Sequence, residues 1–267
     1  MKKSNYIENH RIYWDSYELA FHENTRLGYN DKPKGGTFLY KGKYKPLSVC
    51  KTYENNNYIK LYVPDINGLR KNDKPFTNIV ERRKSHRNFS DEVITLKEIG
   101  SLLYRSARIK SVYKKGFSEA ISKRPYPGAG GNYELEVYLV ANKNIEINSG
   151  IYHYDSCRHA LVNLNASKKY RNLLIEDSKL AAGSDEPPLL ICITCRKKKI
   201  SWKYESIGYS LALKDAGILM YNIHLVSTAM NLGSCILGCG NSVIFSQATQ
   251  IDPLEEPTIG ELVIGHI

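Results

Sequence analysis

The longest periodic run of apolar residues lies in the last third of the chain. Its members recur at intervals of four, three, four, three and four residues: Ala212, Ala216, Leu219, Ile223, Val226 and Met230. This spacing places their side chains on one face of an α-helix. Leu213, Met220 and Leu225 add apolar surface elsewhere around it. The pattern therefore predicts a long, largely buried helix over residues 209–231.

Shorter patterns predict the remaining elements. Apolar and β-branched runs indicate strands at residues 58–63, 135–141, 150–154, 189–195, 234–237 and 258–264. Helices are expected at residues 18–25, 95–107 and 167–180, and Thr95 with Glu98 forms a capping box for the second. Pro and Gly predict a linker over 64–78, and basic, polar residues predict a loop over 108–123. Strands that cluster late, without a regular strand–helix–strand series, indicate an α+β fold.

The first part of the chain differs from the rest. It is rich in Tyr, Asn and Lys, and its periodicity is weak. We therefore expect an N-terminal extension at residues 1–78 and a folded domain at residues 79–267.

The charge balance is basic, with a net charge of +11. The lysines are dispersed and no stretch carries a nucleic-acid signature, so we expect a solvated basic surface and no nucleic-acid partner. The N-terminus has no apolar run, and no window approaches the roughly 18 apolar residues of a membrane span. We therefore expect a cytoplasmic protein that does not enter a membrane.

Six cysteines are present, and reduced thiols are the expectation for a cytoplasmic protein. Cys192 and Cys195 are three positions apart in a predicted strand, so they face opposite sides, which is poor geometry for chelation. Cys235 and Cys239 have the same difficulty. Buried structural thiols are favoured over a zinc site, and no metal is expected.

A basic segment with one hydroxyl group precedes the helix at 95–107. Arg83, Lys84, Ser85 and Arg87 can converge on one phosphate, because Arg supplies a planar donor fork and Ser a hydroxyl. On spacing alone, a solvated basic turn is the favoured alternative.

A run of small residues lies before the strand at 135–141. It consists of Pro127, Gly128, Ala129, Gly130 and Gly131, and it lets a backbone approach a planar ligand closely. The run lacks the third Gly of a dinucleotide fingerprint, and a strand follows where that motif needs a helix. We therefore reject a Rossmann-type site, and a plain turn is the alternative.

Lys203 and Tyr204 precede the long helix. Partial desolvation of a lysine there would lower its pKa toward the range of a general base. A solvated lysine beside an interface tyrosine is the alternative.

Together these motifs resemble the SagB-type azoline dehydrogenases of the FMN-dependent nitroreductase superfamily. The segment from Arg83 to Phe89 is similar to the Arg-x-Ser-x-Arg-x-Phe signature that holds the phosphate and ribityl chain of FMN. Residues 127–136 resemble a Pro-Ser-Gly-Gly-Ala-Leu-Tyr-Pro-x-Glu stretch along the flavin ring. The chain departs from that stretch at Gly128, where the family has Ser, at Asn132, where it has an apolar residue, and at Glu134, where it has Pro.

Two further segments carry the resemblance. Lys203 and Tyr204 match a Lys-Tyr pair that general nitroreductases lack. The helix that follows matches a Gly-Tyr-x-x-Ala-Leu-x-x-x-Gly pattern in register, beginning at Gly208. The turn that contains Gly233 and Gly238 resembles one that borders the flavin.

The resemblance implies a nitroreductase-like fold: a mixed β-sheet flanked by helices, with a long buried central helix and FMN at the interface of an obligate homodimer. It implies oxidation of thiazoline or oxazoline rings to thiazole or oxazole in a ribosomally made modified peptide such as a bacteriocin. Lys203 or Tyr204 would take the proton from the ring's Cα, and hydride would pass to the flavin. An azoline-containing precursor peptide and a cyclodehydratase would be the partners. Alternatives are a flavin reductase for dehydroamino acids, enones or nitro compounds, or a non-catalytic scaffold subunit.

Overall fold

The computed structural model describes residues 15–26, 28, 36–53, 58–115 and 119–267. Seven strands form one sheet in the order β1-β6-β5-β4-β7-β9-β8. They are β1 (Tyr58–Lys60), β4 (Leu135–Ala141), β5 (Gly150–Asp155), β6 (Ala160–Asn163), β7 (Leu189–Cys195), β8 (Leu232–Leu237) and β9 (Thr258–His266). The ladders between these strands are antiparallel. Isolated parallel bridges join Ser85 to Ser234 and Ile94 to Ile145, so the pairing is mixed.

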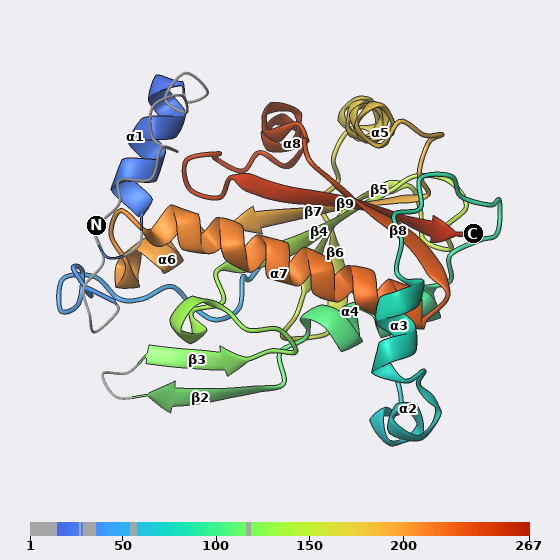
Figure 1. The fold of residues 1–267 in the computed structure, drawn as a ribbon, viewed down its shortest axis with the longest axis horizontal. Helices are drawn as coiled ribbons and strands as arrows, with labels where there is room; N and C mark the ends of the chain where they lie inside the picture. The colour runs from blue at the N-terminus through green and yellow to red at the C-terminus, as the bar shows by residue number, and fades with distance from the viewer. Residues whose placement is uncertain (1–14, 27, 29–35, 54–57, 116–118) are drawn as a thin grey trace, which may run out of the picture.

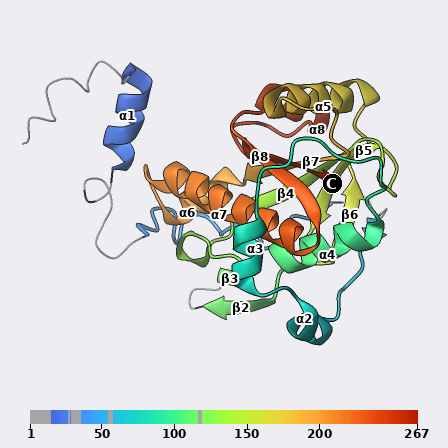
Figure 2. The same cartoon turned by 45° about the vertical axis from the view of Figure 1, so that its right-hand side comes forward.

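Helices cover both faces of this sheet. The helices α4 (Leu96–Ala107) and α7 (Gly208–Ala229) lie on one face, and α5 (Lys168–Ala182) and α8 (Ser242–Thr249) lie on the other (Figures 1 and 2). The central strands β4 and β7 are buried along their whole length because both of their faces are covered. Two apolar clusters, one on each face, form the core. The predicted α+β fold with a helix-flanked sheet is confirmed.

The long helix α7 runs for 22 residues across one face of the sheet. Its predicted inner face is largely correct, because Ala212, Ala216, Leu219 and Ile223 are buried. The expectation that the helix is largely buried holds for that face only. The opposite face exposes apolar side chains in the single chain: Leu213, Ile218 and Tyr221.

The predicted linker at 64–78 is wrong. The chain forms α2 (Ile66–Asn72) and α3 (Phe76–Arg82) there. Asp65 caps α2 through the backbone N–H of Asn67, and Pro75, one of the residues that suggested a break, instead precedes α3.

The predicted loop at 108–123 is also wrong. It forms a hairpin of β2 (Ser111–Lys115) and β3 (Glu119–Lys123). No alternation was recognisable, because among the hairpin residues whose burial is described, two neighbours, Ile121 and Ser122, are the buried ones. The strand β6 and the helices α6 (Lys197–Lys203) and α8 were not predicted, since each is too short to show a clear period. The capping box of α4 is confirmed.

Residues 36–53 are attached to the domain by a covalent bond and by polar contacts. Cys50 forms a disulfide with Cys157, 107 positions away, and their Cα atoms are 6.0 Å apart. The expectation of reduced thiols is therefore wrong for this pair, whose proximity arises from the tertiary fold. The Lys51 ammonium donates to Tyr138 Oη and to the Glu256 carboxylate, each over 2.7 Å.

The other four cysteines are free thiols. Cys192, Cys195 and Cys235 are buried, and Cys239 is exposed. Within the described ranges, no group of three or more His, Cys, Asp or Glu side chains is arranged to hold a metal ion. None of the helices in those ranges has both the length and the apolar composition needed to cross a bilayer.

Candidate functional site

The glycine-rich run forms a tight loop against the end of α6. Residues Ala129–Gly131 make one 3₁₀ turn, in which Gly130 and Gly131 have φ values of 55° and 70°. The Lys203 ammonium, at the end of α6, donates to the Gly130 carbonyl oxygen over 2.6 Å. A Cβ at Gly130 would collide with both Tyr204 Oη and Lys203 Nζ. The loop therefore meets Lys203 and Tyr204 at Gly130. The sequence patterns had indicated the loop and the Lys-Tyr pair separately.

Asp215 of α7 holds the same loop from the other side. Its carboxylate accepts a hydrogen bond from the Ala129 N–H over 2.6 Å and also pairs with the Glu134 carboxyl. Burial and the Asp215 charge raise the pKa of Glu134 to about 8, and burial raises the pKa of Asp215 as well. Within the described residues, no side chain other than Asp215 forms a hydrogen bond with the Glu134 carboxyl. The two carboxyl groups therefore hold a proton between them at neutral pH.

A buried lysine supports the end of the loop. Lys199 of α6 is 6% exposed, and its ammonium donates to the Tyr133 carbonyl oxygen over 3.1 Å. Burial, with Arg196 and Arg124 nearby, lowers the pKa of Lys199 to about 8. The Asn132 amide donates to the Lys199 carbonyl oxygen over 2.8 Å. Lys203, at the end of the same helix, is half-buried.

Tyr204 lies in a buried position beside these carboxyl groups. Burial, with the charges of Asp215 and Glu134, raises the pKa of its phenol. The Tyr204 hydroxyl therefore keeps its proton at neutral pH and offers a donor at the loop.

A second buried ionic group anchors the start of β4. Burial raises the pKa of Glu136, but the hydrogen bond and charge of His153, with Arg196 and Arg124, outweigh it and lower the pKa to about 2. Glu136 Oε2 lies 3.0 Å from His153 Nε2. Glu134 and Glu136, two positions apart in the chain, therefore hold opposite protonation states at neutral pH.

The basic segment at 83–87 lies elsewhere, beside the second half of α7. Ser85 bridges to Ser234 of β8, and the His86 N–H donates to the Ser234 carbonyl oxygen over 3.0 Å. In the described residues, the side chains of Arg83, Lys84 and Arg87 have no carboxylate partner. A pocket of about 340 Å³ opens beside them, lined by Arg82, Lys84, His86, Thr228, Asn231, Leu232 and Ile267. The Arg and Lys side chains of this segment can hold an anion.

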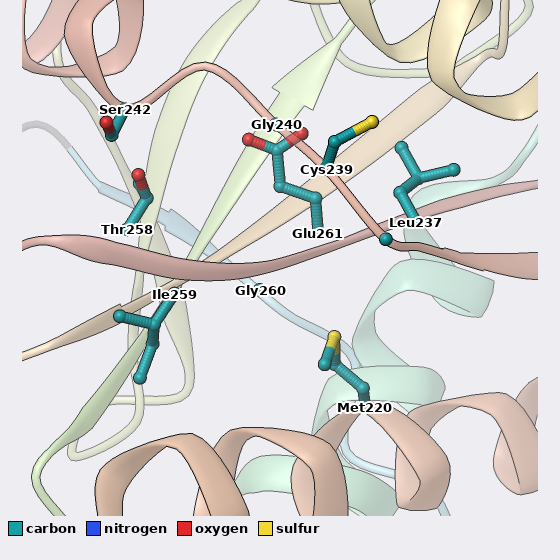
Figure 3. A pocket seen from close by; sticks show the side chains of 10 residues that line it. Met220, Leu237, Cys239, Gly240, Ser242, Thr258, Ile259, Gly260 and Glu261 are labelled. Carbon is teal, nitrogen blue, oxygen red and sulfur yellow. The ribbon is translucent and has the colours of Figure 1, made fainter. Parts of the chain in front are cut away.

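Gly233 is the second residue of β8, and Gly238 directly follows that strand. A Cβ at Gly233 would approach the Cβ of His86 to 2.9 Å, so Gly233 allows the basic segment to pack against β8. Gly238 lines a pocket of about 370 Å³ between the loop after β8, Met220 of α7 and the start of β9 (Figure 3). The Glu261 side chain borders this pocket, and burial raises the pKa of its carboxyl to about 7.

The site residues from the sequence analysis therefore fall into two groups along α7. Pro127 to Gly131, Lys203 and Tyr204 lie near Asp215, whereas the 83–87 segment lies near His224, whose Nε2–H donates to the Lys84 carbonyl oxygen over 3.1 Å. Positions 215 and 224 are separated by about 14 Å along a helix and by half a turn around it. Figure 1 shows α6 beside the N-terminal end of α7 and α3 beside its C-terminal end. Within the described residues of one chain, the two groups therefore lie near opposite ends of α7.

The sequence profile of the nitroreductase family matches residues 80–266. The chain belongs to the nitroreductase family. It is accordingly an oxidoreductase of a family that typically binds flavin.

Two relatives support this assignment. A Methanocaldococcus jannaschii protein named as a nitroreductase is 23% identical over 180 residues, which is 67% of this chain and 84% of that protein. The microcin B17-processing protein McbC of Escherichia coli is 31% identical over 117 residues, which is 41% of this chain and 42% of that protein. The similarity to McbC thus spans less than half of this chain and less than half of McbC.

Solved structures share the fold. A structure named as a nitroreductase from Anabaena variabilis has a TM-score of 0.64 at 22% identity, covering 92% of this chain and 45% of that chain. One from Ralstonia eutropha has a TM-score of 0.61 at 19% identity, covering 84% and 95%. The E. coli microcin synthetase McbBCD complex with truncated pro-MccB17 bound has a TM-score of 0.58 at 19% identity, covering 81% and 78%. At these identities the likeness establishes the nitroreductase fold.

Sequence reasoning missed several residues of this region. It noted Glu134 only as a departure from a family pattern, and it did not single out Asp215, Lys199 or Glu261. A signal was present for Glu134, because a carboxylate beside a β-strand's first residue needs a partner if it is buried. Its partner is 81 positions away and could not be read from the local pattern.

Proposed function

We propose that this chain is an FMN-dependent azoline dehydrogenase, which oxidises thiazoline or oxazoline rings of a precursor peptide to thiazole or oxazole. The observation that carries the proposal is the convergence of Lys203 and Tyr204 on Gly130. There Lys203, which is a general base once it is neutral, and the protonated phenol of Tyr204 lie against the glycine-rich loop. The local similarity to McbC, 31% over 117 residues, supports the same reading.

The residues fit a flavin mononucleotide. The side chains of Arg83, Ser85 and Arg87 would hold the phosphate, since they offer cationic and hydroxyl donors without a carboxylate partner in the described chain. Gly238 and the loop at 128–131 would border the ring, because neither position carries a bulky side chain. Glu261 borders the pocket at Gly238, and its Oε1 atom is buried without a hydrogen-bond partner in the described residues, so it can bond to a polar ligand. Bound FMN would supply the hydride acceptor.

The proton roles follow from the environments of the two side chains. Because its raised pKa keeps Tyr204 protonated, Tyr204 Oη orients the substrate as a donor. Lys203 Nζ, once neutral, takes the proton from the ring's Cα. The Gly130 carbonyl, which accepts from Lys203, keeps that amine pointed at the loop.

A homodimer would complete the site. The exposed apolar face of α7 needs a cover, and the two groups of site residues lie on opposite sides of that helix. We therefore propose that each FMN is bound by the 83–87 segment of one chain and the glycine-rich loop of its partner. The precursor peptide, a cyclodehydratase that makes the azoline, and a cytoplasmic location complete the proposal.

Mixing two inactive variants tests the shared site. Arg83→Ala and Lys203→Ala would each lose azoline turnover as pure proteins. After unfolding and refolding together, mixed dimers contain one site with both substitutions and one with neither, so activity returns. Mixtures that stay inactive, although each variant forms dimers with wild-type chain, would show that both groups serve one chain's site.

The absorption spectrum separates the proposal from its alternatives. Flavin bands with FMN released on denaturation, and thiazoline oxidation without added nicotinamide, would support the azoline dehydrogenase. Flavin with turnover that requires NAD(P)H would favour a reductase, such as the 23% identical nitroreductase relative suggests. A chain that takes up no added FMN would leave a scaffold role.

A further inference from the structure

A basic groove lies beside the candidate catalytic pair, and no step of the proposed reaction uses it. Its volume is about 920 Å³, compared with about 370 Å³ for the pocket at Gly238. Residues 41–48 form most of its lining, together with Ala120 of β3 and Trp202 of α6. In Figure 1 this blue segment passes beneath α6, next to the β2–β3 hairpin.

The segment that lines the groove contacts Trp202, the residue before Lys203. The Trp202 indole N–H donates to the Tyr44 carbonyl oxygen over 3.0 Å. The Phe38 ring packs edge-on against Trp202 at a centroid distance of 5.6 Å, and the Phe38 N–H donates to the Lys203 carbonyl oxygen over 3.2 Å. A ligand in the groove would therefore extend toward the loop that Lys203 contacts.

The described residues that line the groove supply positive charge and apolar surface. Residues 36–53 include four lysines and no Asp, Glu or Arg. Lys41, Lys43 and Lys45 line the groove, and the described residues that line it include no acidic side chain. Pro46, Leu47 and the Trp202 ring supply apolar surface. Exposed aromatic surface continues at its edge, where Tyr44 is 68% exposed.

We infer that this groove binds an extended acidic peptide segment that also carries apolar residues. The inference rests on the proposed function in one respect: the segment would flank the azoline in the precursor peptide. Alternating lysines attract carboxylates, and the apolar walls receive the side chains between them. Nucleic acid is disfavoured because the described lining includes no Arg, the residue that binds phosphate in a bidentate manner.

Fluorescence anisotropy measures this binding directly. The probe is a labelled peptide of alternating Glu and Leu, and a Gln–Leu peptide of the same length tests the need for charge. Full-length chain carrying Lys43→Glu with Lys45→Glu is compared with Lys168→Glu with Lys169→Glu, which makes the same charge change on α5. We expect the groove variant to bind the Glu–Leu peptide about tenfold more weakly, and the α5 variant to change it by less than about threefold.

Three results would overturn the inference. Equal losses in both variants would mean that the peptide responds only to net charge. Equal binding of the Gln–Leu peptide would remove the role of the lysines. A single-stranded oligonucleotide that displaces the peptide at physiological salt and binds more tightly would assign the groove to nucleic acid.

A turnover assay keeps this inference separate from the proposed function. With a short azoline substrate that lacks acidic residues, the groove variant should match wild type. With an acidic flank on the same substrate, its KM should rise about tenfold while kcat is unchanged. No turnover by wild type with either substrate would refute the dehydrogenase proposal, and the anisotropy result would still decide whether the groove binds acidic peptide.

Discussion

The Asp215 carboxylate accepts a hydrogen bond from the Ala129 N–H over 2.6 Å, which ties the long helix to the glycine-rich loop. The loop is held from the other side by Lys203, whose ammonium donates to the next residue, Gly130. The backbone between these two contacts is in the left-handed region, which glycine adopts at little cost. The position of the loop therefore depends on one carboxylate, one ammonium and one glycine.

Gly130→Ala should disrupt the candidate site more than it unfolds the protein. The added methyl group meets Lys203 Nζ and Tyr204 Oη, so the pair must move away from the loop. We expect azoline turnover to fall at least about 100-fold, because a displacement of about 1 Å has that effect on reacting groups. Thermal unfolding and turnover are measured on the same preparation.

Gly183→Ala is the matched control. Gly183 also has a positive φ, 63°, but a Cβ there would meet no atom within 4 Å. It should cost about 1–2 kcal/mol of stability through backbone strain and leave turnover intact. Equal turnover by the two variants would mean that Gly130 needs only its backbone conformation.

Glu134→Gln should change how stability depends on pH. The pKa of Glu134 is raised from the usual 4.5 to about 8, so between these values the folded chain binds a proton that the unfolded chain lacks. Wild-type stability from this group is complete below pH 4.5 and is lost as the pH rises toward 8. The amide of Gln can donate to Asp215 at every pH.

Urea unfolding at several pH values gives the comparison. Glu261, whose pKa is raised to about 7, adds a slope of the same sign in both proteins, so the difference between the two proteins reports on the Glu134–Asp215 pair. We expect the stability of the variant relative to wild type to rise between pH 5 and pH 8. A constant difference across that range would mean that Glu134 and Asp215 hold no proton between them.

Lys203→Ala and Tyr204→Phe should separate chemistry from flavin binding. Each should keep the yellow colour and lose turnover, Lys203→Ala by about 100-fold or more, since general base catalysis contributes at least that factor. Lys198→Ala provides the control, because Lys198 lies on the same helix and pairs with exposed Glu255. Colourless Lys203 or Tyr204 variants would instead assign these residues to flavin binding.

Ile218→Glu should dissociate the proposed dimer and reduce flavin retention together. Ile218 is 38% exposed on the outer face of α7, where a partner chain would cover it. An unpaired charge in that interface should raise the dimer dissociation constant by about 100-fold or more. Sedimentation measures the assembly state, and absorbance measures the bound flavin.

Leu254→Glu serves as the control for that experiment, since Leu254 is 83% exposed on the turn between α8 and β9. It should stay dimeric and yellow. If the wild-type chain sediments as a monomer and still retains flavin, each chain holds its own cofactor and the shared site is wrong.

The amino-acid sequence by itself determined the central elements. Mostly apolar runs are sufficient for β4 and β7, because strands covered on both faces bury nearly all of their side chains; Glu136 in β4 and Thr194 in β7 are the polar exceptions. The spacing of Ala212, Ala216 and Leu219 defined α7, and Thr95 with Glu98 defined the start of α4. Each of these signals lies within a few residues, where backbone geometry links sequence to structure directly.

Only the tertiary structure decided the long-range pairs. It placed Glu134 against Asp215, Cys50 against Cys157, and the basic segment half a turn around α7 from the glycine-rich loop. Such contacts depend on how elements pack, and a pattern local to one segment does not encode its distant neighbour. Burial then set the protonation of Glu134 and Lys199, because the cost of a charge depends on the atoms that replace water around it.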